Sequence, residues 1–376
     1  MGSGRHSTAQ DRNKVRYAVV GLGHIAQVAI LPAFRHAANS ELVAVVSGDP
    51  VKRKELSKRY KARIAVDYRG YDELLASGSV DAVYLALPND LHRDFALPAA
   101  KAGVHILCEK PLAATEKDAL AMVTAARQAS VRLMTAYRLH FDSANLEALR
   151  LVQTGKIGDP RVFNSTFTMQ VKDDNIRVRE ARGGGPLFDI GVYCINAARS
   201  LFKDEPTEVT ALAVTSGERR FREIDQSVSV ALKFPHARLA GFVVSFGAAD
   251  LGRYEIVGTR GSLELSPAYE YAEGLTQIIH QNGRQEKRHY QKHDQFAAEL
   301  VYFSRCVLSG KDPEPSGWEG AADVRIIQAV ERSLKTGRSV TLAPFRNPQH
   351  PSPAQKIVRP PGPKPRPLHA SAPHPE

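Results

Sequence analysis

The chain has 376 residues, 43% of them hydrophobic, which is enough for two domains that each bury a core. No stretch approaches the ~20 consecutive apolar residues of a membrane span, and the polar residues 1–14 contain no apolar signal segment, so we expect a cytoplasmic protein with a flexible N-terminal arm and no membrane partner. The formal net charge of +11 can accompany nucleic-acid binding, but no recognition motif supports that function class. The charge equally suits phosphorylated cofactors and anionic substrates.

Up to residue 137 the sequence alternates short apolar runs with helical segments. We expect strands at residues 15–20, 42–46, 64–66, 82–87, 104–108 and 132–136, with helices or helical turns in the intervals between them. Nearly continuous apolar strands are typical of a parallel sheet that is buried on both faces. Residues 15–137 are therefore predicted to form an α/β, doubly wound Rossmann domain.

After residue 137 the pattern changes to polar and apolar residues in alternation, as in an antiparallel sheet with one covered face. We expect a helix at residues 142–154, strands at 161–169, 207–214, 227–234, 239–245, 253–257 and 262–265, and closing helices at 295–308 and 320–336. Residues 138–345 are thus predicted to form an α+β domain built on a large, mostly antiparallel open sheet. The Pro-rich, basic residues 346–376 have little apolar content, so we expect a disordered tail with some polyproline II character near residues 359–363.

A glycine-rich turn follows the first expected strand. Gly21 permits the tight turn, Gly23 lets the backbone approach a pyrophosphate, and Ala26 supplies a small residue for close packing of the next helix. Because a strand precedes the turn and a helix follows it, we interpret residues 21–26, including His24 and Ile25, as a dinucleotide site rather than an ordinary turn.

The end of the second strand indicates which dinucleotide binds. Ser47 and Gly48 follow the strand, and Lys52 opens the next helix. A hydroxyl, a helix N-terminus and a cation suit a 2′-phosphate, so we favour NADP over NAD. Asp49 is the contrary signal, since a carboxylate here could bind a ribose 2′-OH, but we interpret it as the helix N-cap.

Two further strand ends point to the nicotinamide half of the cofactor. Leu87, Pro88 and Asn89 are placed to meet the nicotinamide ribose, whereas His92 has either a packing role or a direct cofactor contact. Glu109-Lys110-Pro111 ends the fifth strand, so the Lys110 ammonium should enter the crevice where such sheets bind ligands.

A second cluster lies at residues 183–196, where three glycines lead into a helical pattern. Asp189 and Tyr193 are four residues apart and share a helix face, as do Tyr193 and Asn196. A carboxylate and a phenol near the Lys110 ammonium could handle a proton, because a cation lowers the pKa of a nearby phenol. The alternative is that Tyr193 is half-buried core and Asp189 a cap.

These motifs together resemble the glucose–fructose oxidoreductase, inositol dehydrogenase and rhizopine-catabolism (Gfo/Idh/MocA) family over about residues 16–342. The resemblance is carried by residues 21–26, 87–92, 109–112, 136–140 and 183–196. The Ser47-Gly48 strand end and the Tyr193 position look closest to the glucose–fructose oxidoreductase branch and the NADP-dependent xylose and dihydrodiol dehydrogenases.

The resemblance implies hydride transfer between NADP and a sugar or polyol carbon. Lys110 would bind the reacting oxygen and position the nicotinamide, Tyr193 would exchange the hydroxyl proton, and Asp189 would orient the substrate. Arg138, Arg177 and Asn196 would border the sugar pocket, and Glu109 and Arg138 would adjoin the cofactor. The resemblance also implies a homodimer or homotetramer. True glucose–fructose oxidoreductases are exported and carry a long N-terminal arm. Because we identify no export signal in this sequence, ordinary release of NADP(H) is the simpler expectation.

Two other functions stay open at this point. A redox-neutral glycosidase of the same fold would keep its NAD bound, and a non-enzymatic NADP-binding sensor would use the basic tail to bind a partner. An intact set of Lys110, Asp189 and Tyr193 argues against the sensor. We expect no metal site, because the three cysteines are far apart and fit neither a disulfide framework nor a zinc site.

Overall fold

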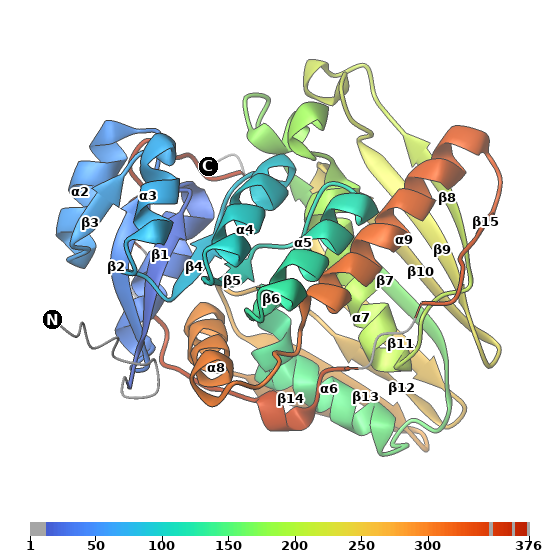
Figure 1. The fold of residues 1–376 in the computed structure, drawn as a ribbon. Coiled ribbons are helices and arrows are strands. Elements are labelled where there is room, and N and C mark those ends of the chain that lie inside the picture. Colours follow the sequence, from blue (N-terminus) through green and yellow to red (C-terminus); the bar gives the residue numbers. More distant parts are fainter. Residues whose placement is uncertain (1–12, 346–348, 363–364, 374–376) are drawn as a thin grey trace, which may run out of the picture.

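The structure is a computed structural model that describes residues 13–345, 349–362 and 365–373. In the first domain, described from residue 13 on, a parallel sheet runs in the order β3-β2-β1-β4-β5-β6 (Figure 1). This strand order is that of dinucleotide-binding doubly wound folds. Its strands are β1 (Val15–Val20), β2 (Ser40–Val46), β3 (Ile64–Val66), β4 (Ala82–Leu85), β5 (His105–Cys108) and β6 (Leu133–Thr135).

Helices cover both faces of this sheet. The helices are α2 (Pro50–Tyr60), α3 (Tyr71–Ala76), α4 (His92–Lys101) and α5 (Glu116–Gln128). The helix expected after the glycine turn divides into a π-helical turn (Ala26–Ile30), the short α1 (Leu31–Ala33) and a 3-10 turn (Phe34–His36). The predicted Rossmann fold is confirmed, and the predicted strands lie where the sheet has them within a few residues.

One helix belongs to the second part of the sequence but packs on the first sheet. Helix α8 (Gln295–Ser309) places Phe296, Leu300 and Phe303 in a buried cluster with Tyr17 of β1. The Tyr17 and Ser304 hydroxyls lie 2.7 Å apart inside this cluster. The two parts of the chain therefore share a core and are not joined by a linker alone.

The second sheet has the order β14-β13-β12-β11-β7-β10-β9-β8-β15 over its described residues, and it is antiparallel except for the β10–β7 pair. Its strands are β7 (Pro160–Gln170), β8 (Glu208–Val214), β9 (Ser227–Phe234), β10 (Arg238–Ser245), β11 (Gly247–Gly258), β12 (Gly261–Leu265), β13 (Leu275–Gln281), β14 (Arg284–Tyr290) and β15 (Val340–Thr341). The predicted open, mostly antiparallel sheet is confirmed. The sequence analysis did not identify β13, β14 or β15.

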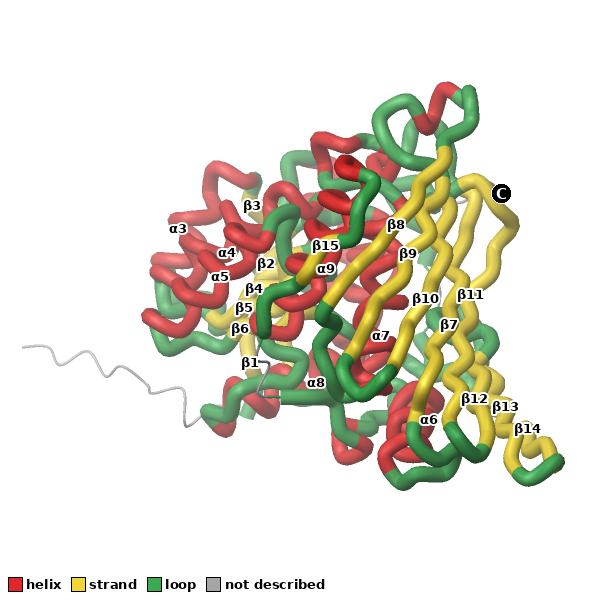
Figure 2. Tube along the Cα trace, turned by 90° about the vertical axis from the view of Figure 1, so that its right-hand side faces the viewer, coloured by secondary structure: helices red, strands yellow, loops and turns green. Residues whose placement is uncertain are grey.

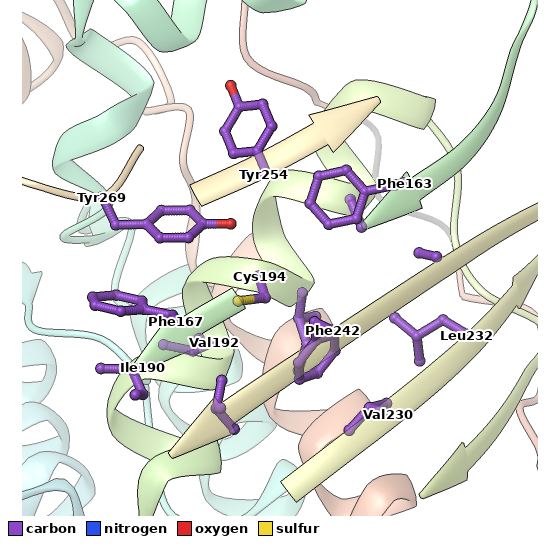
Figure 3. Packing of buried hydrophobic residues seen from close by; sticks show 14 of the residues in the cluster. Phe163, Phe167, Ile190, Val192, Cys194, Val230, Leu232, Phe242, Tyr254 and Tyr269 are labelled. Carbon is purple, nitrogen blue, oxygen red and sulfur yellow. The ribbon is translucent and has the colours of Figure 1, made fainter. Parts of the chain in front are cut away.

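Helices α6 (Ser143–Gln153), α7 (Val192–Phe202) and α9 (Gly317–Thr336) lie against one face of this sheet, and Figure 2 shows the other face without a covering helix. The core between sheet and helices is apolar. Figure 3 shows Phe242, Val230 and Leu232 of the sheet opposite Val192 and Cys194 of α7. This packing fixes α7, and with it Tyr193, relative to the sheet.

The C-terminal segment differs from the expectation of disorder. Residues 349–362 and 365–373 lie against the body of the protein without forming a strand, and Ile357 is buried in the cluster that contains Phe141. The Gln355 amide donates to the Glu314 carbonyl at 2.8 Å. The prediction of disorder is therefore wrong for these two ranges, because single anchoring residues supply contacts that a low apolar content does not reveal.

Part of the sequence-based expectation lies outside the described residues. The N-terminal arm was expected at residues 1–14, of which 1–12 are not described, and the polyproline II stretch reaches residue 363, which is not described either. Within the ranges that are described, no helix is both long enough and apolar enough to cross a membrane.

Candidate active site

The glycine turn after β1 forms an open cradle. Gly21 has φ +91°, and a Cβ built on it would lie 2.4 Å from the Ala86 carbonyl oxygen, so no larger residue fits there. A Cβ on Gly23 would meet no atom within 4 Å. His24 and Ile25 are half-buried in the same turn. Free space beside exposed backbone is what a pyrophosphate needs, so this turn fits a dinucleotide.

The end of β2 has the features expected of a site for a 2′-phosphate. Ser47 is buried, its carbonyl accepts from Arg53 at 2.6 Å, and its hydroxyl accepts from the Asp49 amide at 3.2 Å. Gly48 is exposed next to it, and Lys52 is half-buried in the first turn of α2. A hydroxyl and an ammonium at a helix N-terminus can bind an anion.

Asp49 is the N-cap of α2, as the sequence indicated. Its Oδ1 accepts from the Val51 amide at 2.8 Å and from the Lys52 amide at 3.1 Å. Its Oδ2 lies 2.9 Å from Nδ1 of His369, and this hydrogen bond, together with the helix amides, lowers the pKa of the carboxyl. Both carboxylate oxygens are thus engaged within the chain.

His92 joins two strand ends. Its ring is fully buried, with Nδ1 3.1 Å from the Pro111 carbonyl oxygen and Nε2 3.0 Å from the Leu87 carbonyl oxygen. Burial lowers the pKa of this imidazole. Of the two interpretations of His92, these contacts favour the packing role: the ring holds the Leu87-Pro88 loop and the Lys110-Pro111 loop at a fixed separation.

Asn89, which was expected to contact a nicotinamide ribose, makes a hydrogen bond to the second domain. Its Nδ2 donates to the Gly183 carbonyl of the second domain at 2.9 Å. A Cβ on Gly183 would lie 2.9 Å from the Asn89 Cβ. Asn89 therefore positions the glycine turn before α7.

Lys110, Asp189 and Tyr193 meet between the two domains. Lys110 follows β5, and its Nζ donates to the Asp189 carbonyl at 2.9 Å and lies 3.7 Å from Asp189 Oδ1. The same Nζ lies 4.6 Å from the centre of the Tyr193 ring. Tyr193 is in the first turn of α7, and Asp189 is in the π-helical turn (Leu187–Gly191) that leads into it. The side chain of Lys110 is only 12% exposed, so this ammonium and phenol face each other in a largely enclosed space.

Arginines surround this cluster. Arg177 donates from Nε to Asp189 Oδ2 at 2.7 Å. Burial opposes ionisation of Asp189, but Arg177 and Lys110 outweigh it and hold the pKa of that carboxyl below its ordinary value. The Arg138 guanidinium lies 5.1 Å from the Tyr193 ring centre and 5.2 Å from that of Tyr271. The site therefore combines a fixed carboxylate with an excess of positive charge.

Glu109, next to Lys110, takes part in a buried carboxyl pair. Its Oε1 accepts from the Tyr84 hydroxyl at 2.9 Å, and the same hydroxyl lies 3.5 Å from Glu299 of α8. Burial raises the pKa of both carboxyls, and repulsion from Glu109 raises that of Glu299 further. Glu109 thus supports the Lys110 strand end from the side of α8.

Asn196 was expected to border the sugar pocket, but its amide belongs to a buried network. Its Nδ2 donates to Glu319 at 2.9 Å and to Asp323 at 3.0 Å, while its Oδ1 lies 2.7 Å from His140 Nε2. The i, i+3 spacing placed Asn196 near Tyr193 on one helix face, but α9 covers that part of α7 and binds the amide.

Three residues of this region were not predicted from the sequence. Tyr271 faces Arg138, Gln295 accepts a hydrogen bond from Arg138, and the Oε1 atom of the buried Glu299 has no hydrogen-bond partner. Tyr271 is in a loop after β12, and the other two are on α8. No motif marks them, because their roles depend on α8 packing against the first domain.

Two successive parts of the chain match models of known protein families. Residues 15–137 match the description "Oxidoreductase family, NAD-binding Rossmann fold", and residues 145–264 match "GFO/IDH/MocA C-terminal domain". The chain belongs to the Gfo/Idh/MocA oxidoreductase family. The resemblance inferred from the motifs is confirmed.

Relatives within the Gfo/Idh/MocA family include sugar dehydrogenases. The chain is 31% identical to D-xylose 1-dehydrogenase (NADP(+)) 2 of Haloferax volcanii, over 87% of this chain and 99% of that protein. The chain is 30% identical to D-xylose 1-dehydrogenase [NADP(+)] of Haloarcula marismortui, over 90% of this chain and 96% of that protein.

Among solved structures, the aldose-aldose oxidoreductase of Caulobacter crescentus complexed with glycerol is similar, with a TM-score of 0.84 and 36% identity, over 88% of this chain and all of the other. A 3-ketoreductase of Actinomadura kijaniata in complex with NADP and TDP-benzene has a TM-score of 0.79 and 27% identity, over 86% and 98% of the two chains. These similarities extend over both domains, so they include the cluster between them.

Proposed function

We propose that this protein is an NADP-dependent oxidoreductase that transfers hydride between the nicotinamide and a sugar or polyol carbon bearing a hydroxyl or carbonyl oxygen. One observation carries the proposal: the Lys110 ammonium lies 4.6 Å from the Tyr193 ring at the carboxyl end of the first sheet. The relatives named above act on xylose and on aldoses, as their names state, which supports a sugar as substrate.

The cofactor, when bound, accepts or supplies the hydride, and the protein binds and orients the reactants. Gly21, Gly23, His24 and Ile25 would hold the pyrophosphate, and Ser47, Gly48 and Lys52 would hold the 2′-phosphate. The engagement of both Asp49 oxygens supports NADP over NAD, because that carboxylate is then not free to accept a bond from a ribose 2′-OH.

The proton and the charge are handled by three side chains. Lys110 would donate to the reacting oxygen of the substrate and stabilise the negative charge that develops there. Tyr193 would take the hydroxyl proton during oxidation and return it during reduction. Asp189, held by Arg177 at 2.7 Å, would orient the substrate and the ammonium. Arg138 and Arg177 would border the sugar, whereas the buried amide of Asn196 would not.

The two alternative functions make different demands on the same site. A redox-neutral glycosidase would release a sugar without a net change in nicotinamide absorbance. A sensor would bind NADP without turnover, and it would not need an ammonium, a carboxylate and a phenol in contact. We also propose that the enzyme is cytoplasmic and forms a homodimer or homotetramer.

The proposal is tested by screening aldoses and polyols with NADP⁺ and NADPH and by substituting Lys110. The Lys110→Ala variant is expected to lose about 10²–10³-fold in kcat, the range for removing one donor that stabilises a developing negative charge. Its melting temperature and its NADPH dissociation constant are expected to stay near those of the wild type. Lys101→Ala, on the exposed end of α4, is the matched control. Normal turnover by Lys110→Ala would contradict the assignment, and sugar release without a net absorbance change would favour the glycosidase.

A further inference from the structure

The C-terminal residues 365–373 contact the rim of the cofactor cradle at two points. The amide of Leu368 donates to Oε1 of Gln27 at 2.7 Å, and the carbonyl of Leu368 accepts from Nε2 of Gln27 at 2.8 Å. Gln27 is the residue after the Gly21–Ala26 turn, and its Nε2 also donates to the Leu22 carbonyl at 3.0 Å. One residue on, His369 meets Asp49 at the end of β2.

The same segment continues to the second domain. The Pro373 carbonyl accepts from the amide of Lys172, just after β7, at 3.0 Å. Residues 368–373 therefore extend from the glycine turn to the other domain, and six residues reach at most about 20 Å. Figure 1 shows the C-terminal end beside the junction of the two domains. The segment thus spans from the glycine turn of the first domain, at Gln27, to Lys172 of the second domain.

The earlier residues 349–362 anchor this crossing. Ile357 is buried, Gln355 donates to Glu314, and the Arg359 carbonyl accepts from the Asp294 amide at 2.9 Å. These contacts hold the chain against the body up to residue 362 and bring the following residues to the groove. Residues 365–373 are thus held close to the body by the preceding residues of the same chain.

We propose that residues 365–373, the C-terminal strap, are part of the cofactor site and slow the release of NADP(H) by closing the mouth of the groove. This inference rests on the proposed function, because it takes NADP as the cofactor. Opening the groove requires at least the bonds from Leu368 to Gln27 and from Pro373 to Lys172 to break. We therefore expect slow release of NADP(H), in place of the ordinary release that was expected from the sequence.

The charge of the strap favours a closing role over competition with the cofactor for the phosphate site. Residues 365–373 contain Arg366 and His369 and no acidic residue. A segment that occupied the phosphate cradle in place of the cofactor would need anionic groups to satisfy the helix N-terminus and Lys52. A basic segment instead attracts a cofactor that carries several phosphate charges.

The experiment measures how fast NADPH leaves the protein. Wild type, a chain ending at Gly362 and the Leu368→Pro variant are each loaded with NADPH and mixed with excess NADP⁺, and the loss of bound-nicotinamide fluorescence gives the dissociation rate. The shortened chain keeps the anchor formed by residues 349–362. Leu368→Pro removes the amide hydrogen that Gln27 Oε1 accepts, together with the leucine side chain. Ser371→Ala, an exposed side chain of the same segment, is the control.

We expect release to be about tenfold faster or more in the shortened chain and faster in Leu368→Pro, because several hydrogen bonds are lost and a factor of ten corresponds to about 1.4 kcal/mol. Ser371→Ala should release NADPH like the wild type. Equal rates in all four proteins would overturn the strap while leaving the proposed function standing. Slower release of NADPH or tighter binding of NADPH by the shortened chain would overturn the proposal, because the strap would then compete with the cofactor for its site. If the wild type binds no NADPH, both the strap and the proposed function fail.

Discussion

Tyr193 packs in the core of the second domain and is also the proton carrier of the proposed mechanism. Its ring is partly buried against the core of the second domain, with the ring centres of Phe167 and Tyr269 each 5.8 Å away. On its other side it meets the Lys110 ammonium. The two interpretations of Tyr193, core residue and proton carrier, are therefore compatible, because the packed ring holds the hydroxyl in place.

The Tyr193→Phe variant separates these two roles. It keeps the ring, its packing and its contact with Lys110, but it has no hydroxyl to exchange a proton. We expect kcat to fall about 10²–10⁴-fold with no change in melting temperature or in the NADPH dissociation constant. Tyr290→Phe is the control. Tyr290 is on the edge strand β14 and its hydroxyl donates to Gln277, so this variant should keep normal turnover. A Tyr193→Phe enzyme as fast as the wild type would remove Tyr193 from the mechanism.

At the scale of elements, buried charges join α7 to α9. Arg199 of α7 is only 2% exposed and lies 2.6 Å from Glu205, 2.8 Å from Glu319 and 2.7 Å from Asp323. Tyr137, at the end of the first domain, donates to Asp323. Removing one partner of such a group leaves a buried charge uncompensated, at a cost of about 3–5 kcal/mol. This network therefore fixes α7, which carries Tyr193, relative to the first domain.

His140 makes part of this network sensitive to pH. Burial disfavours its imidazolium, but Glu314 at 3.0 Å outweighs burial and raises the pKa of His140 to about 9. Because the folded pKa lies above the ordinary value of 6.5, the stability from this pair is complete below pH 6.5 and is lost as the pH rises through about 9. We expect the melting temperature to fall between pH 6 and pH 9, by about 1 °C for each kcal/mol lost.

The His140→Gln variant tests the origin of this dependence. Glutamine can keep hydrogen bonds but cannot titrate, so the variant should be less stable at pH 6 and lose less between pH 6 and pH 9. Scanning calorimetry at both values measures the difference. His289→Gln, an exposed position on β14, should retain the wild-type dependence. A wild-type melting temperature that rises over this interval would refute the assignment.

At the scale of the whole molecule, the second sheet has an exposed apolar face. Leu212 is 75% exposed, Val214 67% and Leu239 57%. These residues come from β8 and β10, the two strands on either side of β9 in the sheet (Figure 2). An exposed apolar patch of this kind indicates an association surface. It supports the proposed homo-oligomer.

The Leu212→Lys variant tests this surface. A charge at the centre of an apolar contact is expected to weaken self-association at least about tenfold, which light scattering after size-exclusion chromatography would detect as a shift toward the monomer mass. Leu308→Lys changes an exposed apolar residue of α8, away from this sheet, and should keep the wild-type mass. A wild-type monomer would contradict the proposed oligomer, and an unchanged Leu212→Lys mass would exclude this face.

The sequence predicted most of the fold because both domains follow local periodicities. The apolar strands β1, β2 and β4 are buried on both faces, and the alternation in β9 puts every second residue inside. Strand β14 was missed because its residues, Arg284–Tyr290, are almost entirely polar and lie at the sheet edge. An edge strand is held by main-chain pairing with one neighbour, which leaves no pattern in its side chains.

The sequence by itself determined the candidate roles of Lys110, Asp189 and Tyr193, because a strand end and an i, i+4 spacing are local features. Only the tertiary structure decided what these residues meet. Lys110 and Asp189 are 79 positions apart, and Gln27 and Leu368 are 341 apart. Contacts at such separations depend on how the two sheets and α8 pack together. For that reason the Asn196 amide is bound by Glu319 and Asp323, and a tail that its composition predicts to be disordered lies against the residue that follows the glycine turn.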